Sequence, residues 1–163
     1  MPTLATQAQE HQARWDEIIA DPALKDLPYK VETNARGQIV LSPHKNRHSD
    51  LQTALFQLLQ RHAPDGHISV EYALATPRGV KVPDVVWMSA ERRDEMRATG
   101  EYSTLAQELC VEVLSPNNRW ANIEEKIELY REAGADEVWV VDTDRQVRCG
   151  GEEEREEATL APD

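Results

Sequence analysis

A lysine in the apolar stripe of a predicted helix is the first residue whose position suggests chemistry. Over residues 120–133 the apolar side chains recur at helical spacing, and Lys126 projects into that stripe between Tyr130 and Ala133. A lysine that points into a protein core needs an anionic partner there, because a buried ammonium without one is costly. The alternative is a lysine at the edge of the stripe whose ammonium reaches back to water.

Two predicted strands supply acidic partners for such a lysine. Asp84 lies in the β-branched run 80–87, where the alternation of side chains turns its carboxylate inward together with valines. Glu112 lies in the short apolar run 109–114, which is followed by a proline that ends strand pairing. Carboxylates are rarely buried unless they are paired or bind a metal ion. Two inward carboxylates and an inward lysine are therefore explained most economically as one site.

Several short motifs around these residues occur in a characteristic order. They are Val82-Pro-Asp-Val85, Val111-Glu-Val-Leu-Ser-Pro116, Glu125-Lys-Ile-Glu-Leu-Tyr130, Gly134 and Val138-Trp-Val-Val-Asp142, preceded by the segment 31–43. In this order they resemble the Uma-type putative restriction endonucleases, a branch of the PD-(D/E)XK nuclease superfamily, with the segment 31–43 similar to that family's opening hairpin. The resemblance implies an α/β fold, an α+β mixed sheet flanked by helices with a restriction-endonuclease-like core.

One position departs from the pattern of the superfamily. Leu114 stands where the lysine of the (D/E)XK motif would follow the acidic residue by two positions. Uma-type proteins are similar in lacking a lysine there. The resemblance implies that the lysine has moved to the following helix, which makes Lys126 its spatial substitute.

Hydrolysis of a phosphodiester bond would use such a set of residues. The reaction needs a hard divalent cation that polarises the phosphate and activates water, and Mg²⁺ prefers oxygen ligands. On this interpretation Asp84 and Glu112 bind Mg²⁺ or Mn²⁺, the backbone carbonyl of Val113 is another ligand, and Lys126 is the catalytic cation. The matching glutamate of the family's opening hairpin adds Glu32 as a further acidic ligand, although an exposed strand glutamate explains that residue equally well. We therefore expect a metal-dependent endonuclease that acts on DNA.

Length and composition predict a single domain over residues 1–150, including an N-terminal helix, and an acidic, disordered tail over 151–163. No apolar run is long enough to span a membrane, and the first residues lack the basic and apolar regions of a signal peptide. The expected location is the cytoplasm.

Hydrophobic periodicity also predicts the order of the elements. We expect a helix that ends at Asp21-Pro22, a hairpin over 31–43, a helix from about Leu51 to the turn 63–66, strands 68–72 and 80–87 paired as a hairpin, a short helix from Ser89 to about Ala98, and a β-α-β crossover from the Glu112 strand through the Lys126 helix to the strand 137–141.

The net charge of −12 is the main observation against a protein that binds nucleic acid, since such proteins usually present a basic surface. Candidate contacts to phosphate are Lys45, Arg47, His48, Arg78, Lys81 and Arg119. The acidic balance favours an alternative, a non-catalytic interaction or regulatory module that keeps the nuclease fold and could act as a homo-oligomer. A metal-dependent hydrolase of another phosphate ester is a third possibility. The predicted set of inward charges, Asp84, Glu112 and Lys126, favours the nuclease over these alternatives.

Overall fold

The fold is described by a computed structural model that covers residues 3–43, 46–115, 118–142, 146–150 and 155–159. Within these residues the chain forms α1 (Leu4–Ile19), β1 (Tyr29–Thr33), β2 (Ile39–Pro43), α2 (Asn46–His62), β3 (His67–Val70), β4 (Leu74–Thr76), β5 (Gly79–Lys81), β6 (Val85–Met88), α3 (Ala90–Arg97), β7 (Leu109–Val113), α4 (Trp120–Glu132), β8 (Glu137–Val141), β9 (Gln146–Gly150) and β10 (Arg155–Thr159).

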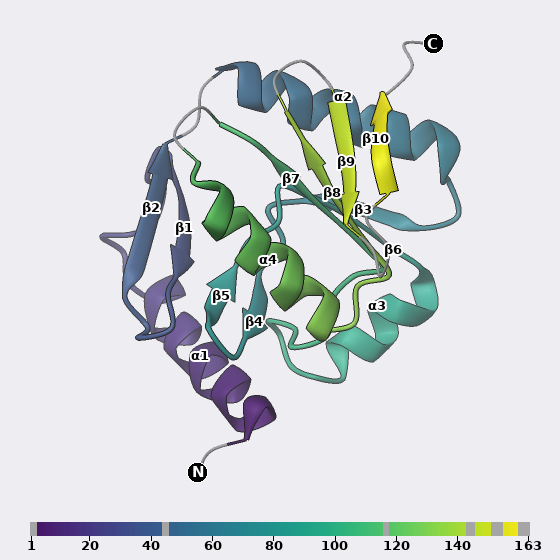
Figure 1. Cartoon of the computed structure of the whole chain (residues 1–163). Helices are drawn as coiled ribbons and strands as arrows, with labels where there is room; N and C mark the ends of the chain where they lie inside the picture. Colours follow the sequence, from purple (N-terminus) through teal and green to yellow (C-terminus); the bar gives the residue numbers. More distant parts are fainter. Residues whose placement is uncertain (1–2, 44–45, 116–117, 143–145, 151–154, 160–163) are drawn as a thin grey trace.

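A mixed sheet with the strand order β10-β9-β8-β7-β6-β3 organises these elements (Figure 1). Strands β7 and β8 are parallel, and the other neighbours in the sheet are antiparallel. Because parallel neighbours need a long connection, α4 crosses from the end of β7 back to the start of β8. The expected β-α-β crossover is confirmed.

The two faces of the sheet pack against different helices. Leu55 of α2 belongs to the core cluster that contains Val111 and Val113 of β7, whereas Tyr130 of α4 packs with Cys110 of the same strand. Side chains alternate between faces along a strand, so even-numbered residues of β7 face α4. Figure 1 shows α4 crossing one face of the sheet, with α2 behind the other. Glu112 therefore points toward α4, and β7 is buried along its whole length.

Two small hairpins extend one side of this core. Strands β1 and β2 pair with each other, and so do β4 and β5. Helix α1 packs on the second hairpin, where Trp15 and Ile18 contact Val80 and Val82 in a third apolar cluster. The α1 helix and the hairpin over 31–43 are both where the sequence predicts them.

The predicted strand 80–87 is wrong as a single strand. It divides into β5 and β6, which belong to different sheets, with Val82, Pro83 and Asp84 between them. Proline has no N–H to donate to a strand ladder, which explains the break at this point. Asp84 still donates its own N–H to the carbonyl of Val111 at 2.9 Å, so its backbone is fixed against β7. The expected antiparallel pairing of β3 with β6 is present, with the β4–β5 hairpin inserted between them.

The acidic C-terminal residues also differ from expectation. Residues 155–159, which the composition assigns to a disordered tail, form β10 and pair antiparallel with β9 at the edge of the sheet. Strand pairing of this kind uses backbone groups, which an acidic composition does not remove. Residues 151–154 and 160–163 lie outside the described residues, and the division of the chain at residue 150 stays a prediction.

The helices of the described residues include none with the length and apolar character needed to cross a membrane. The short helix α3 begins as predicted, since Ser89 accepts a hydrogen bond from the N–H of Arg92 at 3.1 Å.

A close approach between the two hairpins depends on Gly79, and we predict that Gly79→Ala destabilises the fold. Gly79 has φ +113°, and a Cβ there would lie 2.3 Å from the carbonyl oxygen of Thr33. The matched control is Gly37→Ala, where φ is also positive, at +74°, but the nearest atom is 3.5 Å away on the flexible Arg14 side chain. Urea denaturation should give a loss of about 3 kcal/mol or more for Gly79→Ala and about 1 kcal/mol for the control. Equal losses would show that the close approach is unimportant.

Candidate functional site

A cluster of buried charges lies where β1, β7 and α4 meet the chain before β6. It consists of the carboxylates of Glu32, Asp84 and Glu112 and the ammonium groups of Lys30 and Lys126. Lys30 and Glu32 are two residues apart on β1 and share a face, and Asp84 precedes β6. Each of the five side chains is mostly or fully buried. We call this group the ionic cluster.

Asp84 is the most completely paired carboxylate of the ionic cluster. Its Oδ1 lies 3.0 Å from Nζ of Lys30 and 3.2 Å from Nε2 of His48, and its Oδ2 accepts the N–H of Val113 at 2.7 Å. Burial alone would raise the pKa of Asp84. The Lys30 ammonium, together with His48 and the Val113 N–H, instead holds that pKa well below its usual range. Asp84 is therefore ionised at neutral pH although its side chain is 1% exposed.

Glu112, on β7, is also buried but has a different environment. Its Oε1 accepts a hydrogen bond from the Tyr130 hydroxyl at 2.5 Å and lies 3.6 Å from Nζ of Lys126. Its Oε2 lies 3.6 Å from Nζ of Lys30. Burial is the largest effect on its pKa and raises it, and the negative charges of Asp84 and Glu32 add to this, against the two lysines. The same burial, with Glu112 beside it, raises the pKa of Tyr130 well above its ordinary value, so the tyrosine remains a hydrogen-bond donor.

Lys126 does not reach back to water. Its Nζ lies 2.8 Å from Oε1 of Glu32, and its side chain is 17% exposed. The second oxygen of Glu32 accepts the N–H of Val82 at 2.7 Å, so this carboxylate ties α4 to the segment that leads to Asp84. Glu32 is 5% exposed, which excludes the interpretation of an exposed strand glutamate. Its role as a metal ligand stays a prediction.

Two residues that contact Asp84, Lys30 and His48, have positions that the sequence motifs do not predict. Lys30 lies just before the predicted hairpin 31–43 and belongs to none of the motifs, although its spacing of two from Glu32 puts both side chains on one face of an extended strand. His48 was expected to contact phosphate from the surface, but it is buried against Asp84. Its helix, α2, also presents Gln52 one turn later, and Nε2 of Gln52 donates to the backbone carbonyl of Asp84 at 2.7 Å.

In the part of the chain that the structure describes, Arg78, Lys81 and Arg119 form no ion pair with the ionic cluster, although Lys81 lies close enough for the charges of Glu32, Lys126 and Glu112 to act on its pKa. Arg78 is exposed and lies 3.9 Å from Glu125. Lys81 donates to the carbonyl of Thr33 at 2.9 Å, and burial lowers its pKa. Arg119 is exposed at the start of α4. Lys45 and the side chain of Arg47 lie outside what the structure describes.

The ionic cluster has the donor chemistry that a hard divalent cation requires. Asp84 and Glu112 present carboxylate oxygens to one common point, and that point holds a cation, the ammonium of Lys30. Among the described residues no three His, Cys, Asp or Glu side chains converge as a metal site. Val113 contacts Asp84 through its N–H, and the ligand role of its carbonyl stays a prediction. The residues fit Mg²⁺ or Mn²⁺ in type, provided that Lys30 gives up its place.

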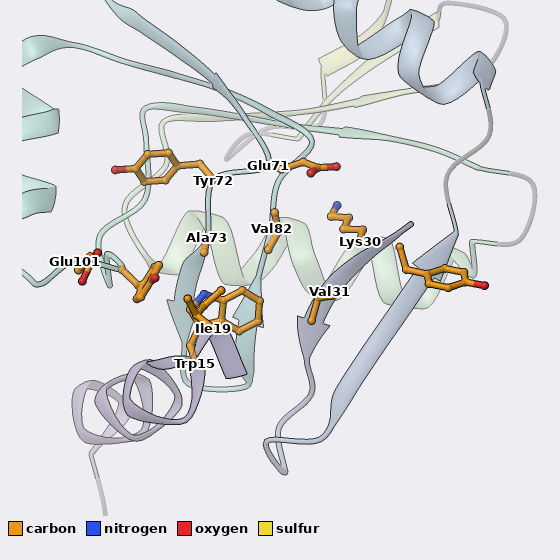
Figure 2. A pocket seen from close by; sticks show the side chains of 11 residues that line it. Trp15, Ile19, Lys30, Val31, Glu71, Tyr72, Ala73, Val82 and Glu101 are labelled. Carbon is orange, nitrogen blue, oxygen red and sulfur yellow. The ribbon is translucent and has the colours of Figure 1, made fainter. Parts of the chain in front are cut away.

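A cavity of about 450 Å³ adjoins the ionic cluster. Figure 2 shows Lys30, Val82 and Glu71 among the side chains that line it, together with aromatic residues such as Trp15 and Tyr72. Lys30 belongs to both the cavity wall and the ionic cluster, so the cavity reaches the buried charges at this residue.

Comparison with known proteins bears on this arrangement. The family model of Uma2, described as "Putative restriction endonuclease", matches residues 17–160. The chain belongs to the Uma2 family. A crystal structure from Anabaena variabilis, described as a putative nuclease belonging to DUF820, is similar in fold, with a TM-score of 0.65. The two chains are 19% identical, and the match covers 82% of this chain and 80% of the other. No curated protein matches the chain.

These findings confirm the family and the restriction-endonuclease-like fold that the motifs predicted. In this Uma2 chain the residues of the PD element, the acidic strand and the following helix all contribute to one buried group. Among the ion pairs of the described residues, Asp84 and Lys126 do not contact each other directly. Lys30 contacts both Asp84 and Glu112, and Glu112 in turn contacts Lys126.

We predict that Glu32→Gln destabilises the protein, because it leaves Lys126 without its nearest anion. The expected loss is about 3 kcal/mol at neutral pH by chemical denaturation. The matched control is Glu125→Gln on the same helix as Lys126, a partly exposed position where about 0.5 kcal/mol or less is expected.

The difference between wild type and Glu32→Gln should shrink in acid. Although burial opposes it, Lys30 and Lys126 hold the pKa of Glu32 below its ordinary value. A depressed folded-state pKa contributes stability above the unfolded-state pKa of about 4.3, and that stability is lost as the pH falls through the folded-state pKa. Denaturation curves from pH 7 downward test this, and a constant difference would contradict the ion pair.

Proposed function

We propose that this protein is a nuclease that hydrolyses phosphodiester bonds of DNA with the help of Mg²⁺ or Mn²⁺ at the ionic cluster. The carrying observation is the convergence of Asp84, Glu112 and Lys126, which come from three separate motifs, on one buried group. Membership of a family described as restriction endonucleases supports the reaction class. The expected cytoplasmic location, and the possibility of a homo-oligomer, belong to this proposal.

Asp84 and Glu112 would hold the divalent ion. Both carboxylates are buried, Asp84 just before β6 and Glu112 in the adjacent strand β7, and oxygen ligands of this type suit hard cations. When bound, the ion supplies polarisation of the phosphate and activation of a water molecule. Asp84 is oriented by Val113 N–H and His48, and Glu112 by the hydroxyl of Tyr130. Such contacts fix the direction of each carboxylate before a substrate arrives.

Lys126 would stabilise the negative charge that grows on the phosphate. Although burial alone would lower it, Glu112 and Glu32 raise the pKa of Lys126, so its ammonium stays charged at any working pH. The contact with Glu32 at 2.8 Å holds the ammonium beside Glu112. In this proposal Glu32 acts as a positioning residue, and the preorganised cation needs little rearrangement during the reaction.

A non-catalytic module with the same fold is the alternative that one observation favours. The ionic cluster is largely satisfied by its own lysines, and the chain carries a net charge of −12. A closed network of buried ion pairs can exist for structure alone. Activity measurements on variants of the carboxylates separate the two functions.

We predict that Asp84→Asn and Glu112→Gln each lower DNA cleavage by at least about a hundredfold. Purified protein is incubated with plasmid and with linear single-stranded DNA in Mn²⁺ or Mg²⁺, and EDTA serves as the blank. Glu125→Gln is the matched control, because it removes a partly exposed carboxylate from the helix that carries Lys126. Circular dichroism establishes that each variant is folded. Undiminished cleavage by both folded acid variants would remove the ionic cluster as the active site.

We further predict that Lys126→Met lowers the rate of cleavage by about a hundredfold while leaving the affinity for Mn²⁺ largely unchanged. Arg131→Met is the charge-matched control, since it also removes one cation from α4. Single-turnover cleavage and isothermal titration with Mn²⁺ give the two quantities. A Lys126→Met protein that cuts at the wild-type rate would show that the lysine serves the fold only.

A further inference from the structure

The ammonium of Lys30 lies between the two carboxylates that the proposed function assigns to the divalent ion. Its Nζ is 3.0 Å from Oδ1 of Asp84 and 3.6 Å from Oε2 of Glu112. The side chain is 6% exposed, so water does not screen these contacts effectively. No motif of the sequence assigns a role to this residue.

We propose that Lys30 is a built-in counter-ion that occupies the place of the divalent metal, and that a metal ion binds to Asp84 and Glu112 only by displacing it. The inference rests on the proposed function, because it takes these two carboxylates as the ligands. An ammonium has no lone pair to offer a metal, and it repels a second cation at short range in a poorly solvated site. The same oxygens therefore serve either the lysine or the metal.

A displaced Lys30 has space to occupy. The cavity of about 450 Å³ is lined by Lys30 itself and by the acidic residues Glu71 and Glu101 (Figure 2). A lysine reaches different positions at little cost because its four-carbon stem is flexible. The cavity thus offers the side chain an alternative position, and of its two acidic residues Glu71 is drawn on the side of Lys30 in Figure 2.

Lys126 provides a comparison within the same ionic cluster. Its Nζ lies 3.6 Å from Glu112, the same distance as that of Lys30, but its closest carboxylate is Glu32 at 2.8 Å. Loss of either lysine therefore removes one positive charge beside Glu112. Of the two lysines, Lys30 alone contacts both Glu112 and Asp84. Its removal therefore frees the position between these two carboxylates, and removal of Lys126 does not.

Direct titration of Mn²⁺ into Lys30→Met and Lys126→Met at pH 8 tests the displacement. Lys30→Met should bind Mn²⁺ at least about tenfold more tightly than wild type, and Lys126→Met should change by no more than about threefold. Without metal, Lys30→Met should melt at a lower temperature than wild type, and saturating Mn²⁺ should close most of that gap. An equal increase in Mn²⁺ affinity in both variants would show that the loss of any nearby positive charge is sufficient, and this would overturn the displacement. Unchanged or weaker binding by Lys30→Met, or no binding by any of the proteins, overturns the proposal.

A measurement on the wild-type chain covers the case in which Lys30→Met fails to fold. Reductive methylation followed by peptide mass spectrometry reports how accessible each amine is, with Mn²⁺ or with EDTA. Mn²⁺ should increase modification of Lys30 several-fold and leave Lys126 nearly constant as an internal reference. Equal modification of Lys30 in both conditions overturns the displacement. Displacement without DNA cleavage would leave this inference standing and defeat the nuclease, whereas cleavage without displacement would do the reverse.

Discussion

A buried charge must have an opposite charge beside it, and this constraint determines how the parts of the protein meet. The ionic cluster joins β1, the segment before β6, β7 and α4, and each of these elements contributes at least one charge. Removing a single partner would leave an ion in a medium that solvates it poorly. The hairpin of β1 and β2, which shares no strand pairing with the main sheet, is thereby held against it.

The alternation of side chains along β7 explains why the ionic cluster can exist in a fold of this size. Odd-numbered residues of β7 pack with the apolar side of α2 and form a core without charges. The opposite face is apolar at Cys110 and charged at Glu112, one step closer to the C-terminal end of the strand. Both faces of the sheet therefore have an apolar core, and on the face toward α4 that core adjoins the ionic cluster at Tyr130, which donates a hydrogen bond to Glu112.

The overall charge and the charge of the ionic cluster act on different scales. The net charge of −12 is spread over the chain and opposes the approach of a polyanion. At the ionic cluster, three carboxylates face two lysines, so their formal charges sum to −1, far less than the net charge of the chain. In the proposed function, a bound metal ion would therefore attract a phosphate more strongly than the surface of the protein does.

Periodicity in the sequence determined much of the fold and part of the candidate site. Helical spacing placed Lys126 toward the core, strand spacing placed Glu112 on the face toward α4, and the ordered motifs predicted the family. These features are local, since each depends on residues within one helix or strand. Only the tertiary structure decided which charges meet. Lys30 reaches Asp84 across 54 residues of sequence, and Lys126 reaches Glu32 across 94, because Pro83 splits the predicted strand and Gly79 lets the β5 turn approach β1. Such pairings follow from the packing of separate elements, which the period of a single element does not specify.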